Sequence, residues 1–415
     1  MSSRGSGIGY DLFRQRRFTE LWSANLVLNL GLVMLMLGVS WEMTSLTSSP
    51  VLVSMVQTVM SLPFVFLSIP VGMASDRRGP RALLLGSQAW MLLVTAFMAA
   101  IALTGGWDFT PTLVLATMSL VGIGLVVQQS AWKPFLHDFV PADRLVAAIS
   151  FNSLSNKISQ TLGPVLGGYL TGLAGAAVVL FTRAGSHLLM IVTLLHLTRK
   201  DSAEEVAPHQ LSSKKSLRDG WDFLRHSPQL YGPMLRSVLL MAPCAGVLAL
   251  LPLEAKENVQ TGAIGYGGLL TALGIGTTAG TSLMPVLQRH LRLNPVATVA
   301  VGGFALAVFG ISRWDSMLLD ASFLLLFGFC WSVLSVSHQF AVQAHSPAEM
   351  RGLMTSTYTL VVQGSMALGS FGFGVLAQQA SVSRSILSAS FVAAAGLVLV
   401  RLFPMPESVA KASAT

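Results

Sequence analysis

The stretch GMASDRRGPR, residues 72–81, separates two apolar runs that are each long enough to cross a lipid bilayer. It carries four formal charges, on Asp76, Arg77, Arg78 and Arg81. A short polar segment between two membrane-length runs predicts two antiparallel helices joined by a tight turn at one membrane face. The fold class then depends on how often this arrangement recurs along the chain.

The composition indicates a chain that is surrounded mostly by lipid. Of its 415 residues, 53% are hydrophobic and only 11% are charged, whereas a soluble globular protein carries about 25% charged residues. The two cysteines, Cys244 and Cys330, lie in apolar runs and are typical of small core residues. The net charge of +8 is interpreted as basic loops facing anionic lipid, so we expect the bilayer as a partner and no nucleic acid.

Apolar runs recur along the whole chain and predict an all-α membrane protein. We expect twelve transmembrane helices, with Gly, Pro or short polar clusters between them. The expected spans are 20–44, 51–72, 81–104, 111–135, 147–171, 175–197, 231–253, 263–286, 294–312, 317–340, 352–377 and 382–403.

The basic residues predict the orientation of these spans. With the N-terminus inside, nineteen of the 26 Lys and Arg residues fall in cytoplasmic segments and three fall in outer loops. Because positive charge accumulates on the cytoplasmic side, we expect both termini there, in a multi-pass protein of the bacterial inner membrane.

An internal repeat divides the chain in two. With a shift of 206 residues, Pro141 falls on Pro347, and Gly168 falls on Gly374. A half-length repeat in a twelve-span chain predicts two six-helix bundles, with substrate bound between them. The expected domains are an N-terminal bundle over residues 1–197, a cytoplasmic linker over residues 198–230 and a C-terminal bundle over residues 231–415.

These motifs resemble the major facilitator superfamily over essentially the whole chain. Residues 72–81 are similar to the family's loop signature between its second and third helices, although Pro80 stands where a second basic residue is common. Ser159-x-x-x-Gly163-Pro164-x-x-Gly167-Gly168 resembles the fifth-helix signature of the family's exporters. Residues 18–22 and 41–47 resemble a bacterial branch that includes enterobactin exporters. The resemblance implies a monomeric transporter with the major facilitator fold.

The loop signature is expected to act as a conformational lock formed by Gly72, Asp76, Arg77, Gly79 and Arg81. Asp76 is able to accept hydrogen bonds from a helix N-terminus and to pair with a basic side chain. Such a cluster would hold the cytoplasmic side shut until the transporter switches. The alternative is a tight turn that contributes only to topology.

The fifth span is expected to bend or to pack closely. Gly163, Gly167 and Gly168 allow a neighbouring helix to approach, and Pro164 removes a backbone donor. Packing alone would explain the glycines, and a gating kink is the second interpretation.

Intramembrane ionisable residues are costly, so each one is a candidate for function. Glu42 lies toward the outer end of the first span, where a carboxylate is able to couple transport to protons. The alternative is that Glu42 is simply hydrated at the outer membrane interface. Arg183 and His187 share one face of span six and are expected to line a cationic cavity; a structural bond from Arg183 to a carbonyl is the alternative.

Polar side chains on several spans complete the expected cavity. They either line a pore or hold helices together, and for Lys157 snorkelling toward the cytoplasmic face is the alternative. The candidates are Asn25, Asn29, Gln129, Asn156, Lys157 and Gln363.

The chain lacks an ATP-binding P-loop, a zinc-protease motif and a nucleophile elbow, so we expect no enzyme, cofactor or metal. The leading prediction is a proton-coupled exporter of a small amphipathic molecule such as a siderophore or drug. A lysophospholipid or lipid flippase is one alternative, and a membrane enzyme or sensor on a transporter scaffold is another.

Overall fold

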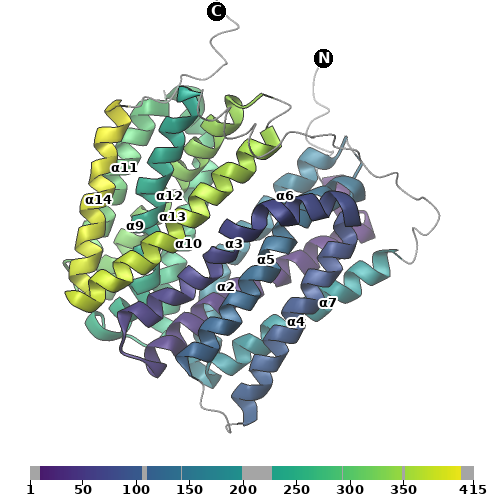
Figure 1. The fold of residues 1–415 in the computed structure, drawn as a ribbon, viewed down its shortest axis with the longest axis horizontal. Helices are drawn as coiled ribbons and strands as arrows, with labels where there is room; N and C mark the ends of the chain where they lie inside the picture. The colour runs from purple at the N-terminus through teal and green to yellow at the C-terminus, as the bar shows by residue number, and fades with distance from the viewer. Residues whose placement is uncertain are drawn as a thin grey trace, which may run out of the picture.

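The computed structural model describes residues 10–104, 110–141, 143–198, 227–291, 293–347 and 351–402. Within this part of the chain, twelve long helices coincide with the twelve predicted spans, which confirms the all-α fold (Figure 1). A short helix α1 (Tyr10–Phe13) precedes them. The long helices are α2 (Arg16–Leu46), α3 (Pro50–Arg78), α4 (Pro80–Thr104), α5 (Pro111–Phe139), α6 (Leu145–Ala174), α7 (Ala176–Thr198), α9 (Pro228–Leu253), α10 (Ala263–His290), α11 (Leu293–Ile311), α12 (Met317–Ala344), α13 (Arg351–Gln379) and α14 (Val382–Leu402).

Eleven helices in the described residues are long and apolar enough to cross a membrane, and α6 is the long helix that falls short. The predicted fifth span is therefore a helix of the right length but of lower hydropathy. Its sequence explains this difference, because Asn152, Asn156, Lys157 and Gln160 lie on it. Since α6 packs against both α2 and α10, these polar groups face protein rather than lipid alone.

The helices form two bundles, α2–α7 and α9–α14, which stand side by side in Figure 1. The repeat is visible in their spacing. Helix α5 begins at Pro111 and α12 at Met317, while α6 begins at Leu145 and α13 at Arg351, so both pairs are 206 residues apart. Two main crossings join the bundles, one between α6 and α10 and one between α3 and α13.

The repeated glycines lie at these crossings. A Cβ on Gly168 of α6 would lie 2.7 Å from the carbonyl oxygen of Ala263 and 3.0 Å from Cα of Gly267, both on α10. A Cβ on Gly374 of α13 would overlap the hydroxyl of Ser54 on α3. Both halves of the repeat thus use the same glycine to bring one bundle against the other.

Two turns with positive φ serve to name the ends of the molecule. Gly79 (φ 78°) joins α3 to α4 at one end, and Gly175 (φ 74°) joins α6 to α7 at the other. We call these the Gly79 end and the Gly175 end. Glycine occupies both turns because a side chain would strain a left-handed backbone.

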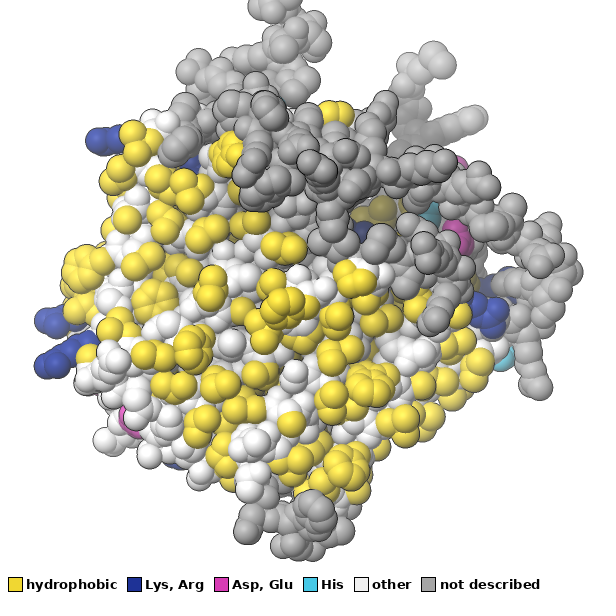
Figure 2. Space-filling model, in the orientation of Figure 1, with side chains coloured by type: hydrophobic (Ala, Val, Ile, Leu, Met, Phe, Trp, Pro, Cys, Tyr) yellow, Lys and Arg dark blue, Asp and Glu magenta, His cyan; other side chains and the backbone are white. Residues whose placement is uncertain are grey.

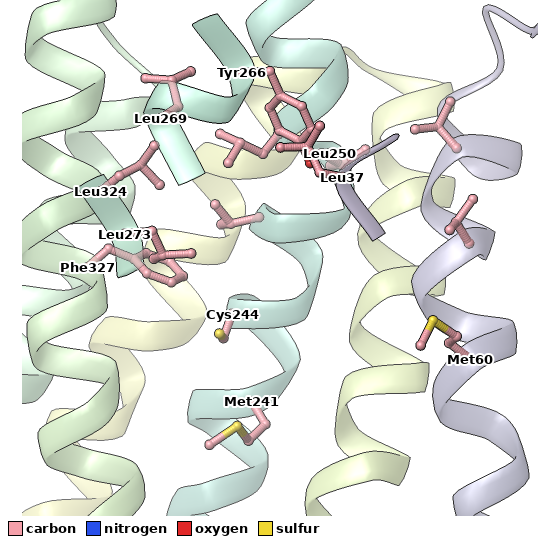
Figure 3. Close-up of a cluster of buried hydrophobic side chains, with 14 of the residues drawn as sticks. Leu37, Met60, Met241, Cys244, Leu250, Tyr266, Leu269, Leu273, Leu324 and Phe327 are labelled. Atoms are coloured by element: carbon pink, nitrogen blue, oxygen red, sulfur yellow. The ribbon is translucent and has the colours of Figure 1, made fainter. Parts of the chain in front are cut away.

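Apolar residues cover the lipid-facing surface and fill the core. Figure 2 shows hydrophobic side chains across the middle of the visible face, with Lys and Arg at its margins. Inside, one buried cluster crosses between the bundles: Leu37 on α2 and Met60 on α3 belong to the same cluster as Leu250 and Tyr266 of the other bundle (Figure 3). Because this cluster fills the contact between the bundles with apolar side chains, polar groups that face a cavity must lie elsewhere.

Candidate functional site

A cavity of about 850 Å³ lies between the two bundles, in the half of the molecule toward the Gly79 end. Gln129, Lys133, Asn156 and Ser356 on its wall are exposed, so solvent reaches it from that end. The lining residues are Asn25, Asn29, Leu32, Phe64, Ser68, Leu125, Val126, Gln128, Gln129, Ser130, Trp132, Lys133, Pro134, Asn152, Asn156, Gln343, Thr355, Ser356 and Thr359.

Four of the predicted cavity residues line this space. Asn25 and Asn29 come from α2, Gln129 comes from α5, and Asn156 comes from α6. Asn29 donates through Nδ2 to the hydroxyl of Ser155 on α6, at 3.3 Å. The N-terminal bundle therefore contributes a wall of carboxamides that accept and donate hydrogen bonds.

Sequence reasoning missed two residues at the centre of that wall. Trp132 of α5 and Asn25 of α2 both donate to the Oδ1 atom of Asn152 on α6, at 3.2 and 2.9 Å. The spacing of Asn152, Ser155 and Asn156 on one helical face was the available signal for Asn152. A tryptophan within an apolar helix is typical of core packing, so nothing comparable pointed to Trp132.

Arg183 and His187 take a different position from the expected one. Both are fully buried inside the N-terminal bundle, and neither lines the cavity. Arg183 donates through Nη1 to the carbonyl oxygen of Leu28 at 2.5 Å, and His187 Nδ1 lies 2.6 Å from Gln88 Oε1. Helix α7 packs against α2, α4 and α6, so the polar face of α7 points into its own bundle.

Lys157 and Gln363 lie outside the residues that line the cavity. Lys157 donates from Nζ to the hydroxyl of Ser282 on α10, at 3.3 Å. This contact joins the two bundles along the α6–α10 crossing. Gln363 lies on α13 and is partly exposed.

Glu42 lies near the Gly175 end, where the bundles are in contact. It lines a small apolar pocket of its own bundle with Val39, Met98 and Met118. Two inter-bundle contacts lie beside it: the ring of Trp41 stacks on Tyr266 with centroids 5.8 Å apart, and Lys256 donates to the carbonyl oxygen of Thr44 at 2.5 Å. The predicted proton carrier is thus next to the contacts that close this end.

Two other acids at this end are more deeply buried than Glu42. Glu254 and Asp320 are each 1% exposed. Asn258 donates to Oε2 of Glu254 at 2.7 Å, while Oε1 of Glu254 and both carboxyl oxygens of Asp320 accept no hydrogen bond within the described part of the chain. Because a buried carboxylate without a cation is costly, both are further candidates for proton binding.

The predicted lock is described only in part. Helix α3 continues to Arg78, so the stretch from Gly72 is helical and Gly79 alone makes the turn. No proline interrupts residues 72–78, which explains why the helix extends past the predicted span. The side chains of Asp76 and Arg77 and the surroundings of Gly72 lie outside what the structure describes, and Arg81 is exposed on the first turn of α4.

The fifth-helix glycines make close contacts with two different partners. A Cβ on Gly163 would lie 2.8 Å from the side chain of Val33, and one on Gly167 would lie 2.9 Å from Cα of Met34, both on α2. Gly168 faces α10, as described above, and Pro164 lies within the continuous helix α6. The glycines therefore hold α6 between its own bundle and the other.

Residues 8–415 match the family model described as transmembrane secretion effector. The chain belongs to this family of the major facilitator superfamily. It is accordingly a secondary transporter and a multi-pass membrane protein rather than an enzyme.

Similar curated proteins are transporters as well. An uncharacterised MFS-type transporter of Bacillus subtilis is 22% identical, over 82% of each chain. An enterobactin exporter of Citrobacter koseri is 28% identical over 76% of this chain and 70% of its own length. The enterobactin exporter of Shigella flexneri is 26% identical, and the match spans 65% of this chain and 60% of that protein.

Solved structures of this superfamily share the fold at low identity. A bacterial homologue of the human lysosomal transporter Spinster, in an inward-facing and occupied conformation, matches with a TM-score of 0.72, 12% identity and coverage of 94% of this chain and 97% of that one. The nucleoside transporter NupG matches with a TM-score of 0.71, 12% identity and coverage of 94% and 98%. These matches establish the architecture alone.

Proposed function

We propose that this protein is a proton-coupled exporter that moves a small amphipathic molecule, such as a siderophore or a drug, across the bacterial inner membrane by alternating access. The supporting observation is the cavity between the bundles, which solvent reaches at the Gly79 end while side chains pack together at the Gly175 end. Alternating access requires two states, and in each of them the binding site is accessible from one side of the membrane only.

In this proposal the Gly79 end is cytoplasmic, with both termini and the linker 198–230 on that side. The excess of Lys and Arg in the corresponding segments supports this orientation. The structure then represents an inward-facing state that receives cargo from the cytoplasm. The enterobactin exporters among the relatives support export as the direction.

The chemistry of the cavity supports an amphipathic cargo. Its wall combines the apolar side chains of Leu32, Phe64 and Leu125 with carboxamides and hydroxyls. Apolar lining contributes affinity by burial, while the polar groups orient the molecule and select it.

A transport assay in proteoliposomes tests the coupling. Enterobactin serves as the first cargo, with and without an imposed pH gradient. We expect transport that depends on the gradient, and we expect Glu42→Gln to remove that dependence. Asp320→Asn is the matched comparison, because it neutralises a more deeply buried acid in the other bundle.

The outcomes separate the candidates. Loss of gradient dependence in Asp320→Asn with normal coupling in Glu42→Gln would move the proton site to the C-terminal bundle. Gradient-independent transport by the unmodified protein would overturn proton coupling altogether.

The proposed lock is tested by turnover. Asp76→Asn removes a charge from the Gly79 end without changing the volume of the side chain. We expect slower turnover with nearly unchanged cargo binding, because a lock acts on the switch between states. An unchanged turnover rate would leave residues 72–81 with a role in topology only.

A further inference from the structure

The cavity wall holds a hydrogen-bonded group that consists of Asn25, Trp132 and Asn152. These residues come from three helices, α2, α5 and α6, and all three line the cavity. Both hydrogen bonds of the group end on Oδ1 of Asn152, from Trp132 Nε1 at 3.2 Å and from Asn25 Nδ2 at 2.9 Å.

Trp132 fixes which way both amides point. An indole N–H only donates, so Asn152 must turn its oxygen toward Trp132. Asn25 must then approach that same oxygen with its NH₂ group. The network thereby assigns amide orientations that are ambiguous for an isolated asparagine.

This orientation leaves the Oδ1 acceptor of Asn25 and the NH₂ donor group of Asn152 for a ligand, beside the second N–H of Asn25. Within the described residues, Oδ1 of Asn25 accepts no hydrogen bond and Nδ2 of Asn152 donates none. Nearby, Gln128 lines the same cavity, and its buried Oε1 has no partner among the described residues. Because a buried acceptor without a partner is costly, a ligand that donates to Gln128 Oε1 gains affinity here, and Asn25 and Asn152 add the complementary acceptor and donor.

The charges around this group select against cations. Of the lining residues that the structure describes, Lys133 is the one charged side chain, and it follows Trp132 directly. A cationic ligand would lose hydration in this cavity without meeting a carboxylate on the described wall. A neutral ligand avoids this cost, and an anionic ligand meets the opposite charge of Lys133 on the wall.

We propose that Asn25 and Asn152, oriented by Trp132, form a binding subsite for a cis-amide edge, in which an N–H donor and a C=O acceptor lie side by side. Cyclic dipeptides, lactams and cyclic ureides carry this edge. The cargo class is then a neutral or anionic amphipathic molecule with such an edge. This inference rests on the proposed function, because it names the cargo of the same cavity.

Three probes of similar size test the proposal by equilibrium binding. They are the cyclic dipeptide of two phenylalanines, its N,N′-dimethyl derivative, and a dibenzylpiperazinium cation. Binding to the purified full-length protein in detergent is measured by isothermal titration calorimetry. We expect the cyclic dipeptide to bind about tenfold or more tightly than the dimethyl derivative, with the cation weakest.

Variants assign the effect to these residues. Asn25→Leu and Asn152→Leu should each weaken binding of the cyclic dipeptide about tenfold and abolish discrimination against the dimethyl derivative. Asn152→Asp replaces the donor by an acceptor, so the preference should move toward the cation. Trp132→Phe should reduce discrimination about threefold, because Trp132 is a positioning residue.

Ser153→Ala is the matched control. Ser153 follows Asn152 on α6, but its hydroxyl donates to the carbonyl of Ile149 on its own helix, at 3.0 Å. Binding by this variant should equal that of the unmodified protein. Asn152→Asp preserves the side-chain volume and the oxygen that accepts from Trp132 and Asn25, so it keeps the test valid if a leucine variant fails to fold.

Three results would overturn the proposal: equal binding of the dipeptide and its dimethyl derivative, tightest binding of the cation, or binding of none of the three probes. The assay uses no gradient, so its failure is distinct from failure of the proposed function. Loss of gradient-driven transport with intact amide discrimination would overturn the coupling and leave the subsite standing.

Discussion

The two halves of the repeat place a hydrogen-bonded group on equivalent helices, yet only one of these groups lines the cavity. In the N-terminal half, Trp132 and Asn152 meet Asn25. Positions 206 residues later are His338 and Tyr358, and both lie within hydrogen-bonding distance of the Ser237 hydroxyl on α9, at 3.1 and 3.4 Å. The helices are α2, α5 and α6 in one bundle and α9, α12 and α13 in the other.

Position relative to the large cavity separates the two groups, whereas burial alone does not, because Asn25 is itself only 3% exposed. Ser237, His338 and Tyr358 are 0%, 1% and 6% exposed and belong to the interior of the C-terminal bundle. Their counterparts in the N-terminal bundle line the large cavity. A polar junction of three helices therefore serves packing in one half and is available to a ligand in the other. We infer that duplication supplied the junction and that divergence of its side chains made it a binding wall.

The largest effect is expected where the repeat brings backbone against backbone. A Cβ on Gly369 of α13 would overlap the carbonyl oxygen of Ala242 on α9, whereas one on the equivalent Gly163 would press on the side chain of Val33 at 2.8 Å, with the nearest backbone atom, the carbonyl oxygen of Leu30, at 3.7 Å. Gly369→Ala should cost about 3 kcal/mol and Gly163→Ala about 1 kcal/mol, since a side chain is able to move and a backbone is not. Thermal unfolding in detergent, followed by size-exclusion chromatography, measures both. A greater loss in Gly163→Ala would contradict this ranking.

The second comparison is between a residue of the buried junction, expected to affect stability, and a residue of the cavity wall, expected to affect cargo binding. His338→Ala should destabilise the protein by about 2 kcal/mol, because it empties a buried site and removes a partner of Ser237. Trp132→Phe keeps a ring and should cost less than about 1 kcal/mol, while it weakens cargo binding. Melting temperature and calorimetric binding are measured on both variants. If His338→Ala changes binding but not melting, the buried junction also takes part in recognition.

The third comparison concerns the two crossings between bundles. Gly168→Ala forces a Cβ against the backbone of α10, whereas Gly374→Ala meets the hydroxyl of Ser54, which Ser54→Ala would remove. Gly168→Ala should shift the population away from the closed Gly175 end about fivefold, and Gly374→Ala should shift it less. Spin labels at the exposed Ser45 and Glu257 report this opening. Ser54→Ala removes the overlapping hydroxyl but leaves Cβ of residue 54 at 2.8 Å, so it should restore Gly374→Ala in part; no restoration at all would show that other contacts set the crossing.

The architecture was predictable from the sequence because length and apolarity decide where a helix crosses lipid. The end of α3 was not predictable, because the charges of residues 72–78 are typical of a loop. These residues contain no proline, however, and the helix continues through them. The carboxamides of α2, α5 and α6 were visible as polar residues in apolar runs. Asn25 and Asn156 were selected in this way, and both line the cavity.

The positions of Arg183 and Trp132 were beyond sequence reasoning for a physical reason. Helix α7 is apolar on several faces, so its sequence does not tell whether the face that carries Arg183 meets α2 or lines a cavity. The carbonyl of Leu28 offers Arg183 a partner inside its own bundle. For Trp132, the decisive fact is that its N–H meets an oxygen twenty residues away in the chain, which only the fold brings close.

The smallest effect is expected at Lys157, where the repeat itself predicts tolerance. The equivalent position 206 residues later is Gln363, so one half of the molecule carries a neutral amide at the site where the other carries a charge. The bond from Lys157 to Ser282 is long, at 3.3 Å, and Lys157 is partly exposed, so water is able to replace it. Lys157→Gln should therefore change stability by less than about 0.5 kcal/mol and leave the distance between the Ser45 and Glu257 labels unchanged. Ser282→Ala, which removes the acceptor and keeps the charge, should behave in the same way. A tenfold loss of transport in Lys157→Gln, with normal transport in Ser282→Ala, would show that the charge acts on the cargo and not on the crossing between bundles.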